Sequence, residues 1–420
     1  MRTIVFVSTA SKDALLAAKK LGLRVILVYD EELDCGADYV EQQLWFDPHD
    51  IHCAQQAIAA LQFMQPLHGV ITTDERAVPF AGAISEGLHL PGNTYEASYA
   101  ARNKFVMRQR LSQHGVPCPV FGVARTLPEA RSLAGEIIGF PLVLKPLFGT
   151  VGQGVLRVND PAELEAYFPI VKRVSESYDY FVKDDQYRDY VLLEQYMEGR
   201  EMSLNGLISE GRIQWIGTLD KPNPLQGPTF EETILLTPSR EPAELLREVF
   251  AMAERGVSAL GLWHGTLHAE LRLTAAGPRI LEIAARPIGG ICGRAHTFCL
   301  GSDYYEMVIQ NTLGDKVPVP RDEIRPAGVM MIPVPKSGRF VTVRGVDEAR
   351  RVAGVSEVSI AVRAGQVIST FPEQGYYIGF ILASGASADD VEQSLNMAHS
   401  LLTFEIEPIE AEIAAQAPSA

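Results

Sequence analysis

Residues 268–286, HAELRLTAAGPRILEIAAR, are the most informative stretch of the chain, because apolar and polar side chains alternate on both sides of a turn-forming segment. This alternation predicts a β-hairpin whose turn is Thr274–Pro278. In the register that pairs Leu273 with Arg279, side chains two apart along a strand share a face. The side chains on one such face are His268, Glu270, Arg272, Glu282, Ala284 and Arg286.

The same register puts the carboxylates of Glu270 and Glu282 directly opposite each other. Like charges in that position destabilise a sheet unless something neutralises them. Two carboxylates with a nearby arginine suit Mg²⁺ carrying a phosphate, because Mg²⁺ prefers a few carboxylates plus phosphate oxygens. The alternative is a solvated hairpin whose acidic side chains face water. The hairpin alone does not distinguish this alternative from a magnesium site, so motifs elsewhere in the chain are needed.

The composition indicates a globular protein of several domains. With 420 residues the chain is long enough for roughly two to four domains, and 47% hydrophobic with 8% aromatic residues is ordinary for a folded protein. Lys and Arg number 37 and Asp and Glu 52, so the net charge is −15. No basic block is present, which argues against nucleic acid or an anionic membrane as a partner.

The cysteines indicate a reducing compartment. Cys35, Cys53, Cys118, Cys292 and Cys299 form no CxxC pair and have no zinc-site spacing. We therefore expect reduced thiols in a cytosolic protein. The apolar residues at the N-terminus are too few for a signal sequence, and no apolar run approaches membrane-spanning length. A soluble, cytoplasmic protein is expected.

The N-terminal region alternates strands and helices. Strands are expected at residues 3–8, 24–29 and 68–73, with a helix at 11–21 between the first two. This alternation predicts a parallel sheet covered by helices. The turn Thr9–Asp13 carries no GxGxxG, which counts against a dehydrogenase.

The sequence after the N-terminal region predicts further helices, strands and domain boundaries. A helix is expected from Thr94 to Gly115, and residues 171–190 suggest a helix with a connection. The Pro- and Gly-containing residues 220–238 suit a long loop over a site, and a Pro-rich stretch at 317–326 precedes a final α+β region. Further strands are expected at residues 140–146, 191–196 and 201–208. The regions predicted are residues 1–103, 104–190, 191–320 and 321–420.

A glycine-rich loop with Gly149, Gly152 and Gly154 follows the strand that contains Lys145. Glycines let the backbone approach a phosphate closely, and a nearby lysine neutralises its charge. No GKS or GKT closes the loop, so it is not a P-loop, and the alternative is a glycine-rich hairpin turn. Lys104, on the expected helix, has the alternative of a solvated surface residue.

Two further segments carry polar groups suited to ligands. Residues 192–201, LLEQYMEGRE, join a strand end, whose backbone can bond an adenine edge, to carboxylates that can hold ribose hydroxyls. The alternative is an ordinary strand–turn–strand. Arg286 followed by Gly289-Gly290 suits an anionic acyl phosphate. His268 could contact a substrate or simply be hydrogen-bonded on the sheet face.

The order of these features carries a family resemblance. In sequence order they are Lys104, Lys145 with the glycine loop, residues 194–201, Glu270, Glu282 and Arg286. In that order they resemble the ATP-grasp carboxylate–amine ligases, and the resemblance covers nearly the whole chain, including the Leu90–Asn93 entry to the Lys104 helix. The chain is most similar to the L-amino acid ligases that make dipeptides, including the bacilysin-precursor type. The segments that carry this closer resemblance are Phe230–Glu232 leading to Thr237–Ser239, His268–Glu270, Glu282–Arg286 and Pro372–Phe380.

The resemblance implies a multidomain α/β and α+β protein. A Rossmann-like pre-ATP-grasp domain would precede the ATP-grasp fold, and a small α+β domain would follow it. Lys104, Lys145 and the glycine loop would bind the phosphates of ATP, and Glu201 would hold its ribose. The residues of the implied adenine-binding hinge are Glu194, Gln195, Tyr196 and Met197.

The resemblance also implies the reacting end of the site. Glu270 and Glu282 would hold Mg²⁺ or Mn²⁺. The groups that would stabilise the acyl phosphate are Arg286, Gly289 and Gly290, and those that would contact the amino-acid substrate are Glu232, His268 and Arg286. Many ATP-grasp enzymes have Asn two residues after the second glutamate, where this chain has Ala284, which weakens the expectation of a third side-chain ligand.

The function expected from the resemblance is an ATP-dependent ligase. It would join an amino acid carboxylate to an amine through an acyl phosphate, releasing ADP and phosphate, with small molecules as partners and a homodimer as its assembly. No side-chain nucleophile is required, so the thiols need no catalytic role. The alternatives are a carboxylase-like or purine-pathway ligase, and a non-catalytic ATP-binding regulatory protein, against which the set Glu270, Glu282 and Arg286 argues.

Overall fold

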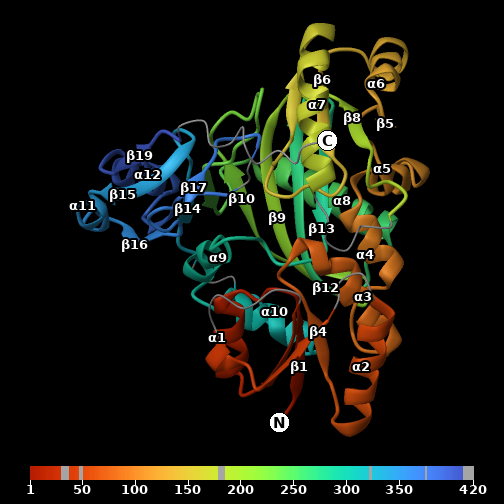
Figure 1. Cartoon of the computed structure of the whole chain (residues 1–420). Helices are drawn as coiled ribbons and strands as arrows, with labels where there is room; N and C mark the ends of the chain where they lie inside the picture. The colour runs from red at the N-terminus through yellow and green to blue at the C-terminus, as the bar shows by residue number, and fades with distance from the viewer. Residues whose placement is uncertain (30–36, 47–50, 178–184, 321–323, 374–375, 410–420) are drawn as a thin grey trace.

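The structure is a computed structural model of the chain that describes residues 1–29, 37–46, 51–177, 185–320, 324–373 and 376–409. Parts of three segments singled out in the sequence, 171–190, 317–326 and 372–380, lie outside these ranges, as does Cys35. Figure 1 shows three lobes around a central sheet: the N-terminal lobe at the bottom, a small lobe with α7 at the top, and the C-terminal lobe on the left. This arrangement confirms the predicted multidomain α/β and α+β fold.

The N-terminal lobe contains a parallel sheet of order β3-β2-β1-β4. Its central strand, TIVFV, is buried along its whole length, as expected for a strand covered by helices on both faces. The predicted βαβ alternation is thereby confirmed. The elements are β1 Thr3–Val7, α1 Lys12–Lys20, β2 Arg24–Tyr29, β3 Gln42–Trp45, α2 Ile51–Met64, β4 Gly69–Ile71 and α3 Val78–Gly87.

The single helix expected from Thr94 to Gly115 is two helices, α4 (Tyr95–Arg102) and α5 (Lys104–Gln113). Asn103 has an extended backbone and ends the first helix while capping the second. Asparagine is favoured at such caps because its side chain accepts from the free backbone N–H groups of the first turn. The break places Lys104 at the very start of α5.

The small lobe contains an antiparallel sheet of order β5-β8-β6-β7, covered by α6 and α7. The loop between β6 and β7 is the glycine-rich loop. The elements are β5 Phe121–Ala124, α6 Leu127–Leu133, β6 Leu142–Pro146, β7 Leu156–Val158, α7 Pro161–Ser177 and β8 Val191–Gln195.

The central sheet has the order β13-β12-β9-β10-β11-β14-β18-β16. It runs without interruption from the middle of the chain into the C-terminal lobe, because β11 pairs with β14. The elements in the middle of the chain are β9 Arg200–Ser209, β10 Arg212–Lys221, β11 Ile234–Thr237, α8 Ala243–Leu260, β12 Gly265–Thr274, β13 Gly277–Ala284, α9 Gly293–Leu300 and α10 Tyr304–Thr312. The C-terminal elements are β14 Ala327–Ile332, β15 Gly338–Arg344, α11 Val346–Arg350, β16 Val355–Ile360, β17 Val367–Ile368, β18 Gly379–Ser384, α12 Ala388–Ser400 and β19 Thr403–Glu407.

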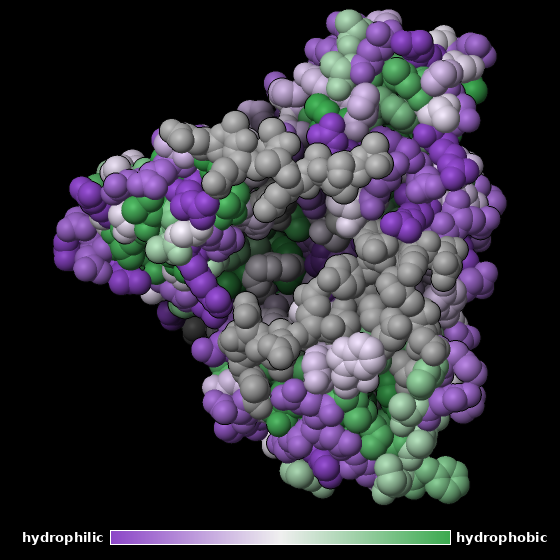
Figure 2. Space-filling model, in the orientation of Figure 1, coloured by the Kyte–Doolittle hydropathy of each residue, from purple (hydrophilic) through white to green (hydrophobic). Residues whose placement is uncertain are grey.

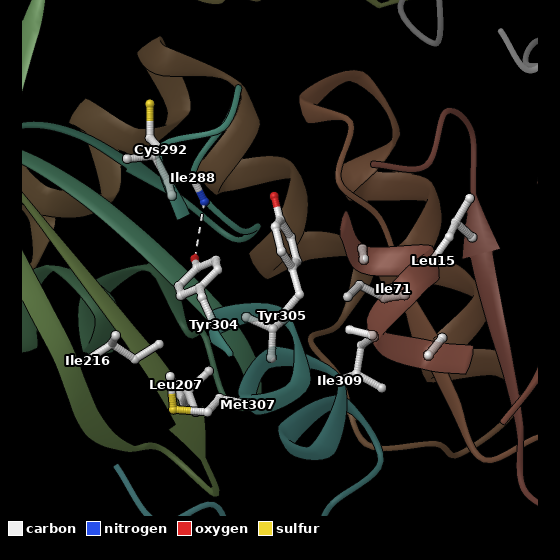
Figure 3. Packing of buried hydrophobic residues seen from close by; sticks show 14 of the residues in the cluster. Leu15, Ile71, Leu207, Ile216, Ile288, Cys292, Tyr304, Tyr305, Met307 and Ile309 are labelled. Carbon is white, nitrogen blue, oxygen red and sulfur yellow. Dashed lines mark hydrogen bonds between the residues drawn. The ribbon is translucent and has the colours of Figure 1, made fainter. Parts of the chain in front are cut away.

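One hydrophobic core joins the N-terminal lobe to the central sheet. Leu15 and Ile71 from the N-terminal lobe pack in the same cluster as Tyr304 of α10, Ile288 and Met331 of β14. Figure 3 shows Ile71 on one side of α10 and Ile288 on the other, with the Ile288 N–H donating to the Tyr304 hydroxyl. Burial of this kind stabilises an interface by about 25 cal/mol per Å² of apolar surface, so the shared core holds the lobes in one arrangement. Within the described ranges, no helix has both the length and the apolar character needed to cross a membrane.

Candidate active site

A cavity of about 440 Å³ lies between the start of α5, the glycine loop, the β12–β13 hairpin and strands β14 and β18. On the face shown in Figure 2 the surface is hollowed between the lobes. Every residue predicted for the site from the sequence lines this cavity, with the exception of Gly154. Segments separated by up to about two hundred residues therefore meet at one place.

The β12–β13 hairpin brings Glu270 and Glu282 opposite each other as predicted, but its register near the turn differs from the predicted one. Glu270 pairs directly with Glu282, as expected. The predicted pairing of Leu273 with Arg279 is wrong, because the turn is shorter than expected and Leu273 lies opposite Pro278. An irregularity next to Glu270 adds one residue to β13 and brings the two carboxylates back into opposition.

Lys104 lies inside the site and does not face solvent. Asn103 fixes the first turn of α5 by accepting from the N–H groups of Phe105 and Val106 at 3.1 and 3.2 Å. The Lys104 side chain is 10% exposed. Its Nζ donates to the Gly149 carbonyl at 2.8 Å and to Glu282 at 3.1 Å. The solvated-helix alternative is thereby excluded.

Gly149 and Gly152 of the glycine loop line the cavity, whereas Gly154 does not line it and lies against Pro146 and Val174. Gly152 and Gly154 both have φ of +69°, which favours glycine. A Cβ on Gly154 would lie 2.8 Å from Pro146 and 2.9 Å from Val174, so a side chain has no room there. Phosphate binding by Gly149 and Gly152 stays a prediction.

Glu194 joins two buried cations. Its carboxylate lies 2.6 Å from Arg108 Nε and 2.6 Å from Lys145 Nζ, and its side chain is 2% exposed. Burial alone would raise the pKa of Glu194, but the charges of Arg108 and Lys145 outweigh burial and lower this pKa to about 2. Burial lowers the pKa of Lys145, and Glu194 opposes that shift. The Glu194 carboxylate therefore orients Lys145 toward the cavity.

The hinge after β8 lines the cavity with Gln195, Tyr196 and Met197. The N–H groups of Gln195 and Tyr196 already donate to backbone carbonyls. The Met197 carbonyl accepts from Arg272 Nη1 at 2.9 Å. The Met197 N–H has no hydrogen-bond partner within the described residues, so it is available to an acceptor on a ligand.

Lys221 is a site residue that the sequence interpretation missed. Its Nζ lies 2.6 Å from Glu201, 2.5 Å from Glu232 and 3.1 Å from Glu270, and its side chain is 2% exposed. Carboxylate oxygens of these three glutamates lie within 4.8 Å of one another, close enough to hold a cation. Residues 220–238 were expected to form a loop, but β10 continues through Lys221, which pairs with Glu201.

The pKa values of Glu232 and Glu270, which both contact Lys221, are shifted in opposite directions. Burial raises the pKa of Glu232 to about 8, reinforced by Glu270 and Glu201 and opposed by Lys221. Burial also acts to raise the pKa of Glu270, but Lys221 and His268 lower it well below its ordinary value. Glu232 thus takes up a proton more readily than Glu270.

His268 contacts the buried Asn205, which in turn contacts the buried His296. Its Nδ1 lies 3.0 Å from Asn205 Oδ1, and the Asn205 amide nitrogen lies 3.0 Å from His296 Nε2. The other ring nitrogen of His268 lies 3.4 Å from Glu270. Burial lowers the pKa of His296 to about 3, so this imidazole is neutral. His268 is hydrogen-bonded on the sheet face and also lines the cavity, and its contact with a substrate stays a prediction.

Arg286 follows β13 and contacts the N-terminal lobe. Its Nη1 donates to the Pro287 carbonyl at 2.7 Å, and its Nε donates to the buried carboxylate of Glu75. Gly289 and Gly290 follow it in the cavity wall. No local pattern pointed to Glu75, because its contact with Arg286 joins residues 211 positions apart.

The far end of the cavity is apolar. Its wall consists of Leu235 of β11, Ile288, Met331 of β14, Tyr377 and Phe380 of β18. Cys292 also lines this end, and burial raises the pKa of its thiol to about 12. This thiol stays protonated at neutral pH and is a poor nucleophile. Cys118, Cys292 and Cys299 are free thiols.

Comparisons with known proteins agree with this geometry. Residues 138–295 match the ATP-grasp domain, residues 15–92 the ATP-grasp N-terminal domain, and residues 330–407 the L-amino acid ligase C-terminal domain 2. The chain therefore belongs to the ATP-grasp superfamily. Within that superfamily it is of the L-amino acid ligase type.

Individual proteins support the same placement. The crystal structure of L-amino acid ligase from Bacillus licheniformis superposes with a TM-score of 0.85 at 28% identity, covering 97% of this chain and 99% of that one. Dapdiamide A synthase from Enterobacter agglomerans is 26% identical over 64% of this chain and 62% of its own length. An uncharacterized protein, y4rH, of Sinorhizobium fredii is 26% identical over 81% of this chain and 68% of its own length. The chain thus spans about two thirds of these curated relatives.

Proposed function

We propose that the protein is an ATP-dependent carboxylate–amine ligase that joins an amino acid carboxylate to the amine of a second amino acid. The observation that carries the proposal is the opposed pair Glu270 and Glu282, which shares one cavity with Lys104, Lys145 and Arg286. The likeness to L-amino acid ligase supports it over nearly the whole chain. Amide formation from a carboxylate requires activation, and ATP supplies it by transferring its γ-phosphoryl group to the carboxylate, which gives an acyl phosphate and ADP. Attack by the amine then forms the amide, loses a proton and releases phosphate.

The residues at one end of the cavity fit a nucleotide. Met197 offers an unpartnered backbone N–H to an adenine edge, and Lys104 and Lys145 offer ammonium groups to phosphates. Both lysines are held by carboxylates, Lys104 by Glu282 and Lys145 by Glu194. Because their side chains are already ordered, they lose little conformational freedom when they bind a ligand.

The carboxylates fit a divalent cation. Glu270 and Glu282 are cross-strand neighbours whose charges are balanced by the ammonium groups of Lys221 and Lys104. We assign Mg²⁺ or Mn²⁺ to these two glutamates, where the ion would neutralise phosphate oxygens during transfer. Ala284 offers no side-chain ligand, so no third protein carboxylate or amide is assigned to the ion.

The chain's own residues then position the reactants. Arg286 and the backbone N–H groups at Gly289 and Gly290 stabilise negative charge on the acyl phosphate and on the tetrahedral state formed when the amine attacks. The carboxylate of Glu232, whose pKa burial raises to about 8, and His268 contact the amino-acid substrates. Cys292 is protonated and takes no part in bond formation.

The apolar end of the cavity indicates the class of amino acid. Leu235, Met331 and Phe380 line the cavity and pack in one hydrophobic cluster with Ile288 and Cys292, which follow Arg286 in the chain. Filling such a pocket with an apolar side chain contributes roughly 1.5–3 kcal/mol, whereas a charged side chain would lose its hydration. The activated amino acid is therefore one with a large apolar side chain. A cytoplasmic location and a homodimer stay predictions.

The experiment that tests the function is phosphate release with Mg·ATP across all pairs of the twenty amino acids, with mass analysis of the products. We expect ADP together with a dipeptide mass for pairs that include a large apolar amino acid. Glu282→Ala should abolish turnover and keep the melting temperature of the wild type within a few degrees. ADP formation that depends on bicarbonate, or tight ATP binding without turnover for any pair, would overturn the proposal in favour of a carboxylase-like ligase or a binding protein.

A further inference from the structure

Glu75 is a buried carboxylate at the boundary between the N-terminal lobe and the cavity. It opens a 3-10 turn, Glu75–Ala77, just after β4, and its side chain is 5% exposed. The turn is held from behind: the Asp74 carboxylate accepts from the Arg76 N–H and from the Ser8 hydroxyl, and the Thr72 hydroxyl donates to the Val7 carbonyl. These bonds fix the Glu75 backbone to the end of β1.

Glu75 determines how the guanidinium of Arg286 is oriented. Of its three nitrogens, Nε donates to Glu75 and Nη1 donates to the Pro287 carbonyl. Nη2 has no hydrogen-bond partner in the described part of the chain, and Arg286 lines the cavity. A planar guanidinium held at two nitrogens has no remaining rotation, so the third nitrogen is aimed.

The two residues are kept in register by the core that joins the lobes. Ile71, four positions before Glu75, and Ile288, two positions after Arg286, pack into the same hydrophobic cluster around α10 (Figure 3). The Tyr304 hydroxyl accepts from the Ile288 N–H at 3.3 Å. The contact between Glu75 and Arg286 is therefore built on two rigid supports, one from each lobe.

The charges agree with an ionised pair. Burial acts to raise the pKa of Glu75, but the charges of Arg286, Arg102 and Lys104 outweigh it and lower that pKa. Burial acts to lower the pKa of Arg286, and Glu75 is the largest influence raising it. Without Glu75, the guanidinium would be a buried charge with no carboxylate in contact.

We propose that Glu75 is a positioning residue of the ligase reaction: the N-terminal lobe supplies the carboxylate that aims Arg286 Nη2 at the negative charge developing on the activated carboxylate. This inference rests on the proposed function of Arg286. It assigns the N-terminal lobe a part in the chemical step, through a residue that does not itself line the cavity. An ion pair that only fastens the lobes together would leave the chemical step unchanged.

The test compares Glu75→Gln and Glu75→Asp with Asp13→Asn. Asp13 of α1 forms another ion pair between the N-terminal lobe and the rest of the chain, at 2.7 Å from Arg294 Nε, and neither residue lines the cavity. Misaiming a group that stabilises developing charge costs about 10- to 1000-fold in rate. We expect Glu75→Gln to lower kcat by at least about tenfold with the KM for ATP within about twofold, and Glu75→Asp to recover part of the loss.

The control separates positioning from fastening. Asp13→Asn should lower the melting temperature by less than Glu75→Gln does, because its ion pair is more exposed, and should keep kcat within about twofold of the wild type. A double-mutant cycle with Arg286→Lys should be strongly non-additive, because both changes remove the same aimed nitrogen. Unchanged kcat in Glu75→Gln, or additive losses in the cycle, would overturn the positioning role.

The inference and the proposed function fail in different ways. If wild-type enzyme turns over and Arg286→Lys does so equally well, the role of Arg286 falls and the positioning role falls with it. If the wild type forms no product from any pair, the proposed function fails, and crystal structures of wild type and Glu75→Gln then decide the positioning role. A rotated Arg286 guanidinium in the variant supports it, and an unchanged guanidinium overturns it.

Discussion

Lys221 lies among three carboxylates that could otherwise hold a cation. The distances from its Nζ to Glu201, Glu232 and Glu270 are 2.6, 2.5 and 3.1 Å. Glu270 is also one of the two residues assigned to the divalent ion, so the ammonium and the ion compete for one carboxylate. Removal of one partner from a buried ion pair costs about 3–5 kcal/mol, because the remaining charges lose their compensation.

The first prediction concerns this competition. In Lys221→Met, Mn²⁺ should bind without nucleotide at least about tenfold more tightly than to the wild type, since the three carboxylates lose their shared ammonium and, among the described residues, only Glu201 keeps a charged partner, Arg272. The binding can be followed by the loss of the free Mn²⁺ signal in electron paramagnetic resonance. The variant should also melt at a lower temperature in EDTA and regain stability with Mn²⁺.

A surface lysine gives the matched control for that variant. Lys20 pairs with Asp303 and Glu306 and is 59% exposed, so Lys20→Met should change neither Mn²⁺ binding nor the melting temperature appreciably. Equal Mn²⁺ affinity in Lys221→Met and the wild type would show that the ammonium does not compete with the ion.

The second prediction concerns His296. Its pKa is lowered by burial from 6.5 to about 3, so the folded protein keeps this imidazole neutral while the unfolded chain protonates it below pH 6.5. The unfolded state therefore binds more protons, and this group lowers the stability by about 1 kcal/mol as the pH drops from 6.5 to 5.5. His296→Gln keeps an acceptor for Asn205 and should remove this part of the pH dependence in urea denaturation curves. Parallel curves for wild type and variant between pH 5.5 and 7.5 would contradict the assignment.

At the scale of elements, the break between α4 and α5 places Lys104, which we propose binds phosphates, at a helix start. Asn103 accepts from two N–H groups of the first turn of α5, and Lys104 is the first residue of that helix. Loss of such a cap costs about 0.5–2 kcal/mol. The same loss frees the backbone that carries Lys104, so geometry and stability are linked at this position.

The third prediction separates these two effects. Asn103→Ala should lose about 0.5–2 kcal/mol of stability and about 10- to 100-fold in kcat/KM, because Lys104 is misplaced relative to the phosphates. Thr126→Ala removes the capping box of α6, which lies away from the cavity, and should lose similar stability with full activity. If both variants keep full activity in the folded state, the cap has no part in positioning Lys104.

The sequence predicted elements better than it predicted how they fit together. The shared face of the β12–β13 hairpin followed from a two-residue period, which survives the wrong pairing of Leu273 because the irregularity beside Glu270 compensates the shorter turn. Lys221 was missed because proline and glycine after it suggested a loop, although β10 extends to that residue. Asn103 within a helical pattern carried a cap signal, and its meaning depends on the extended backbone that the fold imposes.

At the scale of the whole molecule, the cavity has two ends that belong to different parts of the chain. The nucleotide end is lined by the small lobe and the hairpin, and the apolar end by β11, β14 and β18. Contacts such as Glu75 with Arg286 and Gly290 with the Phe380 ring, where a Cβ would lie 3.0 Å from a ring carbon, arise from tertiary packing. No local pattern encodes them, which is why the sequence alone predicted the hairpin face and not these partners.

The fourth prediction follows from this division. Phe380→Ala should raise the KM for the apolar amino acid by about 10- to 100-fold, because the side chain loses part of its apolar wall, while the KM for ATP stays within about twofold. Phe404→Ala, in β19 and away from the cavity, should change neither KM. Steady-state kinetics with each substrate varied in turn measures both values. A parallel rise in the KM for ATP would contradict the assignment of the two ends.

The continuous central sheet also has a consequence for how the enzyme becomes active during its synthesis. Strands β11 and β14 pair directly, and Met331 and Phe380 complete a cavity whose first wall residue is Lys104. A chain still attached to the ribosome can fold its N-terminal lobe as a unit, since domains form in the order of translation. The cavity wall is complete only after β18 has emerged, so we expect partly made chains to leave ATP and free amino acids untouched.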